Sequence, residues 1–267
     1  MNELPFSPIA YETVKVDATG AVIARPANTA RSFVEPRAGL ELVEIPAGRF
    51  TIGAPPSQGG DDERPQHLVA VAGFCMGRGL VTQAQWLAVM GKRLSWRFSG
   101  DALPVDNVAW DEAQAFCAKL SRRTGRTYRL PSEAQWEYAC RAGSSTPFAY
   151  GETLTGDLAN YCAAHVYRAE PAGVYRHTTT PAGAFPPNAF GLYDLHGNLW
   201  EWCADAWHAD YSGAPAGDAP WIAGGDSAAH PVRGGSWHEV PAACRSAARA
   251  RYDGGQGDDL VGFRVVC

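Results

Sequence analysis

Residues 126–143 read RTYRLPSEAQWEYACRAG. The first five residues are strand-like, and Pro131 separates them from Ser132 and Gln135, a spacing typical of the capping box at a helix N-terminus. Gly143 supplies a residue type at which helices commonly end. The pattern predicts a short strand followed by a short helix.

Two further helices are predicted upstream of this block. Residues 81–91, VTQAQWLAVMG, carry a second capping box at Thr82 and Gln85 before a glycine stop. Residues 107–125, NVAWDEAQAFCAKLSRRTG, place apolar side chains at helical spacing and end at Gly125. Both segments therefore indicate short helices with one buried face.

Strands are predicted on either side of the helices. Residues 40–54, LELVEIPAGRFTIGA, alternate apolar and polar side chains around a Pro-Ala-Gly turn, which indicates two strands. Residues 263–266, FRVV, are predicted to form the last strand. Residues 144–183 lack periodicity, and we predict no regular element there.

The domain organisation predicted from these elements is simple. Residues 1–39 are interpreted as an N-terminal extension with a short hairpin at the Ala18-Thr19-Gly20 turn. Residues 40–267 are interpreted as one domain. Nine tryptophans, with 48 Gly and Pro residues, favour a loop-rich fold anchored by large aromatic side chains.

The amino-acid composition of the chain indicates which binding partners and which cellular compartment to expect. A net charge of −5 provides no basic field for a phosphate backbone, so we expect no nucleic-acid partner. No long apolar stretch and no basic, apolar leader occur, so we expect no membrane association and a cytoplasmic location. Seven cysteines without a Cys-x-x-Cys pair are expected to be reduced thiols.

Several blocks, in this order, resemble the formylglycine-generating-enzyme (sulfatase-modifying factor) family. They are residues 74–86 (FCMGRGLVTQAQW), 104–117 (PVDNVAWDEAQAFC), 126–143, 189–203 (AFGLYDLHGNLWEWC), 233–237 (RGGSW) and 262–266 (GFRVV). The resemblance covers residues 40–267 and implies a C-type-lectin-like fold. This is an irregular α+β fold with small antiparallel sheets, few helices and much loop.

The same resemblance implies a copper site that this chain lacks in part. The family's enzymes hold copper with two cysteine thiolates shortly after the Gly-Gly-Ser block, a soft ligand pair suited to Cu(I). Counting forward from that block places Glu239 and Cys244 at the two positions, whereas alignment from Ala247 backward places Pro241 at the second. One sulfur ligand is absent either way, so we expect neither bound copper nor catalytic residues of this kind.

The C-terminal block also resembles the variable proteins of diversity-generating retroelements. In those proteins adenine-directed copying rewrites chosen codons while a lectin-like scaffold holds the backbone. The positions between the fixed residues, interpreted here as a ligand-binding surface, are His238, Glu239, Val240, Ala242, Ala243, Ala248, Ala250, Arg251, Tyr252 and Asp253. Small residues interspersed with aromatic and charged ones are typical of binding surfaces. Changing only the adenines of an AAC codon can encode most of these residues but not glutamate. Glu239 must therefore come from another template codon or from ordinary evolution.

Three functions are consistent with these residues. The first is a non-catalytic scaffold of the C-type-lectin fold that displays a variable C-terminal surface to a protein or other macromolecular ligand. The second is a metal-dependent oxidoreductase of the same family acting in a tailoring pathway. The third is an accessory subunit that supports a partner enzyme.

A structural calcium site is predicted at residues 194–201, DLHGNLWE. Calcium accepts carboxylate and backbone carbonyl oxygens together. By resemblance, the ligands are the Asp194 and Glu201 side chains and the Gly197 and Leu199 carbonyls. The alternative is a plain turn in which Glu201 pairs with a nearby arginine.

Overall fold

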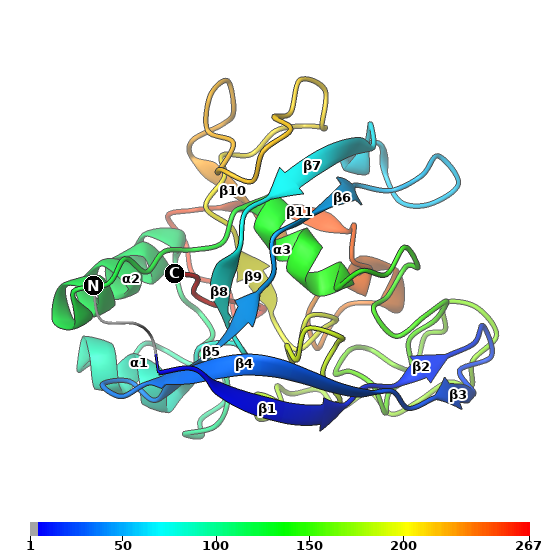
Figure 1. Cartoon of the computed structure of the whole chain (residues 1–267), viewed down its shortest axis with the longest axis horizontal. Helices are drawn as coiled ribbons and strands as arrows, with labels where there is room; N and C mark the ends of the chain where they lie inside the picture. Colours follow the sequence, from blue (N-terminus) through cyan, green and yellow to red (C-terminus); the bar gives the residue numbers. More distant parts are fainter. Residues whose placement is uncertain (1–4) are drawn as a thin grey trace.

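The structure is a computed structural model that describes residues 5–267. It combines small sheets and short helices with long irregular connections (Figure 1). The helices in these residues are α1 (Gln83–Met90), α2 (Trp110–Thr124) and α3 (Glu133–Arg141), with the 3-10 turns η1 (Asp61–Glu63) and η2 (Pro241–Cys244). The predicted α+β fold with few helices and much loop is confirmed.

Two four-stranded sheets organise the molecule. The first has the order β1 (Ser7–Glu12), β4 (Ala27–Glu35), β5 (Leu40–Ile45), β8 (Phe74–Gly77); the second has the order β11 (Arg249–Asp253), β10 (Ala229–Arg233), β9 (Trp200–Trp202), β12 (Val261–Gly262). Two-stranded pairs join β2 (Lys15–Val16) to β3 (Val22–Ala24) and β6 (Gly48–Ile52) to β7 (His67–Val71). The pairing is antiparallel except between β12 and β9.

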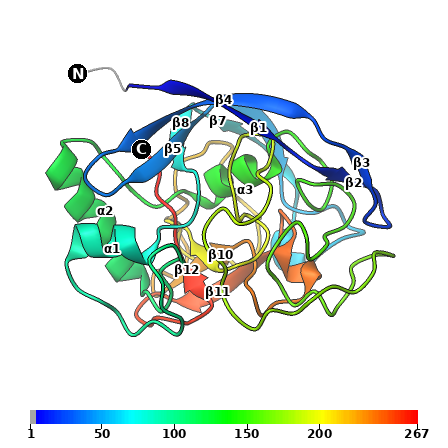
Figure 2. The ribbon, with the colours of Figure 1, turned by 90° about the horizontal axis from the view of Figure 1, so that it is seen from below.

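Strands from the first 39 residues build part of the first sheet. β4 pairs with β5 over residues 32–35, and β1 pairs along the other edge of β4. Figure 2 shows β1 and β4 stretched over α3 and the loops beneath it. β2 and β3 pair across the turn that contains Gly20, whose φ of +79° suits glycine.

The helices lie where the sequence predicts, although α3 is capped at Ala142, one residue before the predicted Gly143. Thr82 and Ser132 each accept a hydrogen bond from the backbone N–H three residues later. Gly91 and Gly125 close α1 and α2 in the left-handed conformation. α1 and α2 then bury aromatic side chains in one cluster, where the rings of Trp86 and Phe116 stack with centroids 5.7 Å apart.

The predicted strand at residues 263–266 is wrong in its position. The last strand pairing of the second sheet falls earlier, at β12 (Val261–Gly262). Val266 instead forms isolated bridges with Met76 and Arg129, because the chain leaves the second sheet and runs between β8 and residue 129. The strand-like residues 126–130 likewise contribute only the bridge at Arg129.

Within residues 5–267 no helix combines the length and the apolar character needed to cross a membrane.

Replacing Ser132 by Ala is expected to lower the free energy of unfolding by about 2 kcal/mol. The Ser132 hydroxyl accepts from the Gln135 N–H at 3.0 Å and donates to the Asp218 carbonyl at 2.7 Å. Urea denaturation measures the change, with the exposed Ser145→Ala as the matched control. Equal stability of the two variants would contradict the role of Ser132 as the N-cap of α3.

Candidate functional site

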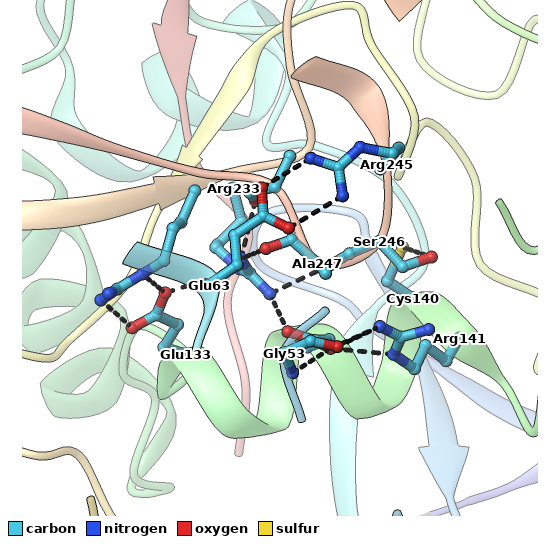
Figure 3. Close-up of polar contacts among 12 residues, drawn as sticks. Gly53, Glu63, Glu133, Cys140, Arg141, Arg233, Arg245, Ser246 and Ala247 are labelled. Atoms are coloured by element: carbon cyan, nitrogen blue, oxygen red, sulfur yellow. Dashed lines mark hydrogen bonds and ion pairs between the residues drawn. The ribbon is translucent and has the colours of Figure 1, made fainter. Parts of the chain in front are cut away.

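Buried ion pairs lie beneath the C-terminal segment (Figure 3). The side chains are Glu63, Glu133, Glu137, Arg233, Arg245 and Arg249. Arg249 contacts both oxygens of Glu133, at 2.7 and 2.8 Å. Arg245 contacts both oxygens of Glu63, at 2.8 and 2.5 Å. Such two-bond pairs fix the orientation of the arginine as well as its position.

Arg233 joins this network to the backbone. Its guanidinium pairs with Glu137 and donates to the carbonyls of Ala247 and Ala248, at 2.7 Å each. It also donates to the Ser246 carbonyl at 3.0 Å. A fully buried side chain therefore holds three successive carbonyls in place.

Electrostatics keep Glu63 and Glu133 charged despite their burial. Burial of Glu133 opposes its ionisation, but Arg249 and Arg233 outweigh this and hold its pKa below the ordinary value. The pKa of Glu63 is lowered in the same way, with burial opposed by the hydrogen bond and charge of Arg245. Arg245 and Arg249 are thus paired with charged carboxylates.

The predicted ligand-binding residues occupy unequal positions above this network. His238, Val240, Ala242, Arg251 and Asp253 are exposed, and Glu239, Ala243, Ala250 and Tyr252 are half-buried. These nine residues are called the recognition face below. Ala248 is buried, with 4% of its surface exposed, so it does not belong to this face.

The structure brings part of the recognition face together, because alternate residues of β11 point to opposite sides, Ala250 and Tyr252 to one and Arg251 and Asp253 to the other. Ala243, Ala250 and Tyr252 pack against one hydrophobic cluster. Burial and the nearby acidic groups, Glu239 among them, raise the pKa of Tyr252 to about 12. β11, which carries Arg251 and Asp253, is an edge strand of its sheet, so one side of it is free of strand neighbours in the described chain.

An aromatic cluster beside His238 was not predicted. The Tyr175 hydroxyl lies 2.6 Å from Nδ1 of His238, and the rings of Tyr175 and His177 are 3.7 Å apart. Phe98 packs edge-on against Trp237 at 5.7 Å. Two of these residues come from the segment without periodicity, where scattered aromatic residues were the available signal.

Arg97 covers this aromatic cluster with a positive charge. Its guanidinium lies 5.3 Å from the centroid of the Trp237 ring and forms an ion pair with Asp259. Cation–π contacts of this kind are weak at exposed sites. The Trp237 ring is buried, so the cluster meets solvent beside the recognition face through the half-buried Tyr175 and the exposed His177.

Cys244 and Glu239 make different hydrogen bonds. The Cys244 thiol is fully buried, lies 3.8 Å from the Val240 carbonyl, and has a pKa raised well above the ordinary value by burial and by Glu239. Glu239 accepts a hydrogen bond from the Trp200 indole at 3.3 Å. Gly235, with φ of +76°, approaches so closely that a Cβ there would lie 2.4 Å from the sulfur.

His196 fixes the backbone at Cys244. The Ala149 N–H donates to Nε2 of His196 at 3.0 Å, so Nδ1 carries the proton and donates to the Cys244 carbonyl at 2.8 Å. Burial, as the largest cause, lowers the pKa of His196 to about 4. The imidazole is therefore a neutral structural link.

The predicted calcium ligands fit the ion only in part. Asp194 is buried, one of its oxygens accepts from the Gly183 N–H at 2.7 Å, and the other has no hydrogen-bond partner. Both oxygens of Glu201 contact Arg264 instead. Residues 5–267 hold no cluster of three His, Cys, Asp or Glu side chains arranged for a metal.

The backbone positions at Gly197 and Leu199 lie in the same turn. The Gly197 N–H donates to the Gly234 carbonyl at 2.7 Å, and the Leu199 side chain is buried beside Trp237. Burial raises the pKa of Asp194 to about 6. Calcium binding by these residues remains a prediction, and it requires Glu201 to exchange Arg264 for the ion.

These features define an α+β domain of the C-type-lectin-like type found in formylglycine-generating enzymes. Residues 30–267 match the model of the sulfatase-modifying factor enzyme 1-like domain, and the chain belongs to this family.

Proteins of several different names are similar to this chain in sequence or in structure. The formylglycine-generating enzyme of Mus musculus is 30% identical over 237 residues, which cover 66% of this chain and 61% of that enzyme. PvdO from Pseudomonas aeruginosa superposes with a TM-score of 0.77 at 34% identity, covering 88% of this chain and 97% of PvdO. Treponema denticola variable protein 1 superposes with a TM-score of 0.72 at 25% identity, covering 89% and 98%.

Lowering the pH from 7 to 5 is expected to reduce the stability contributed by His196. Below about pH 6.5 the unfolded histidine binds a proton that the folded one does not take up until about pH 4, so acid favours unfolding. The loss is about 2 kcal/mol at pH 5. Urea denaturation at both pH values measures it, and His196→Gln should lose about that much less over the same interval. If the wild type and His196→Gln lose the same free energy of unfolding, the conclusion that His196 is neutral in the folded protein is wrong.

Added Ca²⁺ is expected to raise the melting temperature if the predicted calcium ligands bind it. Stabilisation by a ligand grows with its free concentration and reaches about 2.7 kcal/mol at one hundred times Kd. Thermal scans with Ca²⁺ or with a chelator test this, and Asp194→Asn should abolish the difference. If the wild-type protein has the same melting temperature with Ca²⁺ and with the chelator, the predicted calcium site is excluded.

Proposed function

We propose that this chain is a non-catalytic binding protein whose recognition face contacts a protein or other macromolecular ligand. One observation carries the proposal. The fixed arginines of the C-terminal segment point inward into ion pairs, whereas five of the residues between and beside them are exposed. The side chains available to a ligand are therefore not those that hold the backbone.

The chemistry of the face suits a protein ligand. His238, Arg251 and Asp253 supply polar contacts of both signs, and the alanines leave space between them. The half-buried ring of Tyr175, which stacks on the buried Trp237, provides an aromatic contact beside His238. A face of mixed charge offers no continuous site for a phosphate backbone.

We further propose that the recognition face is diversified, as in the variable proteins of diversity-generating retroelements. The similarity to Treponema denticola variable protein 1 supports this assignment. The neighbouring DNA provides the direct test. A reverse-transcriptase gene and a near-copy of the region encoding residues 233–267, differing at adenines, are expected; absence of both would exclude diversification and leave the binding proposal to be tested by itself.

A metal-dependent oxidoreductase is the second candidate function, since relatives of this family are named formylglycine-generating enzymes. It requires a redox metal bound by the purified protein. The buried Cys244, whose pKa is raised, favours the protonated thiol over the thiolate that metals need. Stoichiometric copper or iron that is lost in Cys244→Ala would establish this candidate and overturn the binding proposal.

The recognition face is expected to tolerate simultaneous substitution. A variant with His238→Ser, Val240→Ser, Arg251→Ser and Asp253→Ser should change the free energy of unfolding by no more than about 1 kcal/mol, because these side chains are exposed. The exposed pair of Arg251 with Asp226 contributes little. Urea denaturation provides the measurement.

The matched control for this variant is Arg249→Ser, one substitution two residues before Arg251. It leaves Glu133 buried with part of its charge uncompensated and should cost about 3–5 kcal/mol. If the fourfold variant loses as much stability as the control, the recognition face is part of the scaffold and the proposal fails.

A further inference from the structure

Two cysteines face each other across neighbouring extended segments, far from each other in the sequence. Cys75 lies on β8, and Cys267 lies in the segment that runs alongside it. The Cys75 N–H donates to the Cys267 carbonyl and the Cys267 N–H donates to the Cys75 carbonyl, both at 2.9 Å. This reciprocal pattern is that of directly opposed residues in an antiparallel ladder, whose Cα atoms are about 5.5 Å apart.

The register of this pair is fixed on both sides. The next residue, Val266, bridges to Met76 on one side, and its N–H and carbonyl bond to Arg129 on the other. Figures 1 and 2 both place the end of the chain beside β8 and β5. A slip by one residue would break both sets of hydrogen bonds and move the buried Val266 to the opposite face.

Both thiols lie on the same side of the sheet. Cys75 and Cys267 belong to one hydrophobic cluster, and both line a groove of about 890 Å³ that is also lined by Phe6, Arg31 and Phe190. Cys267 is half-buried, whereas Cys75 retains 9% exposure. The pair therefore faces a space that a small oxidant can enter.

The two sulfurs are chemically unequal. A hydrogen bond from Cys267, the largest cause, lowers the pKa of the Cys75 thiol, and the positive charge of Arg126 acts in the same direction. The same hydrogen bond, together with burial, raises the pKa of Cys267. Cys75 is thus the nucleophile of the pair and Cys267 the resolving thiol.

We propose that Cys75 and Cys267 form a reversible intramolecular disulfide when the protein meets a small disulfide oxidant. The Cα separation set by the ladder lies within the range that disulfides accept. The bond would join the segment after β12 covalently to the first sheet, and so tie the two sheets of the domain together.

The reaction balances with a low-molecular-weight disulfide such as oxidised glutathione as co-reactant. The Cys75 thiolate attacks one sulfur of the oxidant, forming a mixed disulfide and releasing the first glutathione thiolate. Cys267, after losing its proton, attacks the Cys75 sulfur of the mixed disulfide and releases the second glutathione thiolate. Two protein thiols lose two protons and two electrons, and the oxidant becomes two thiols.

Peptide mapping of the full-length protein tests the proposal. The native protein is incubated with oxidised glutathione, remaining thiols are alkylated, and the digest is analysed by mass spectrometry without reduction. We expect a cross-linked peptide pair containing Cys75 and Cys267, restored to two alkylatable thiols by dithiothreitol. The cross-link should also raise the melting temperature by on the order of 10 °C.

The other cysteines serve as internal controls. Burial raises the pKa values of Cys117 and Cys140 to about 12, so both should stay unmodified in the native protein. Cys162→Ser should still form the cross-link, whereas Cys75→Ser and Cys267→Ser should not. A glutathione adduct without the cross-link, a cross-link to another cysteine, or two thiols that remain alkylatable after oxidation would each overturn the proposal.

Discussion

Arginines from the last third of the chain reach inward and pair with carboxylates contributed by α3 and η1. Each partner is buried, and a buried charge that loses its partner costs about 3–5 kcal/mol. The chain between Arg233 and Arg249 therefore has to follow the path that completes every pair. Since Arg233 also binds the carbonyls of residues 246–248, that path is fixed from the interior.

This arrangement separates the residues that hold the backbone from those that meet solvent. Arg249 and Arg251 are two residues apart on β11, yet the first is buried against Glu133 and the second is exposed. Residues two apart on a strand point to the same side, so the difference arises from their position along β11: Arg249 reaches the buried Glu133, whereas Arg251 lies beside the exposed Asp226. A surface built in this way can change its side chains while the ion pairs keep its shape, which is the property that a diversified binding surface requires.

Local patterns in the sequence predicted the helices well, because Thr82, Ser132 and Gly125 act on the few residues beside them. Long-range partners were not predictable in the same way. Glu63, which lies outside the elements predicted from the sequence, pairs with Arg245, 182 positions later. The aromatic cluster at Tyr175 was missed for the same reason, since its contacts are set by tertiary packing and leave no period in the sequence.

The surroundings of Cys244 are those of a buried structural residue. Its carbonyl accepts from a neutral, buried His196, and its sulfur packs against Gly235 with a raised pKa. A metal ligand needs a deprotonated sulfur and a second donor within reach. Glu239 instead bonds to the Trp200 indole. The residues of this loop therefore stabilise the backbone beneath the recognition face, and the proposed ligand binding rests on the side chains that this backbone leaves exposed.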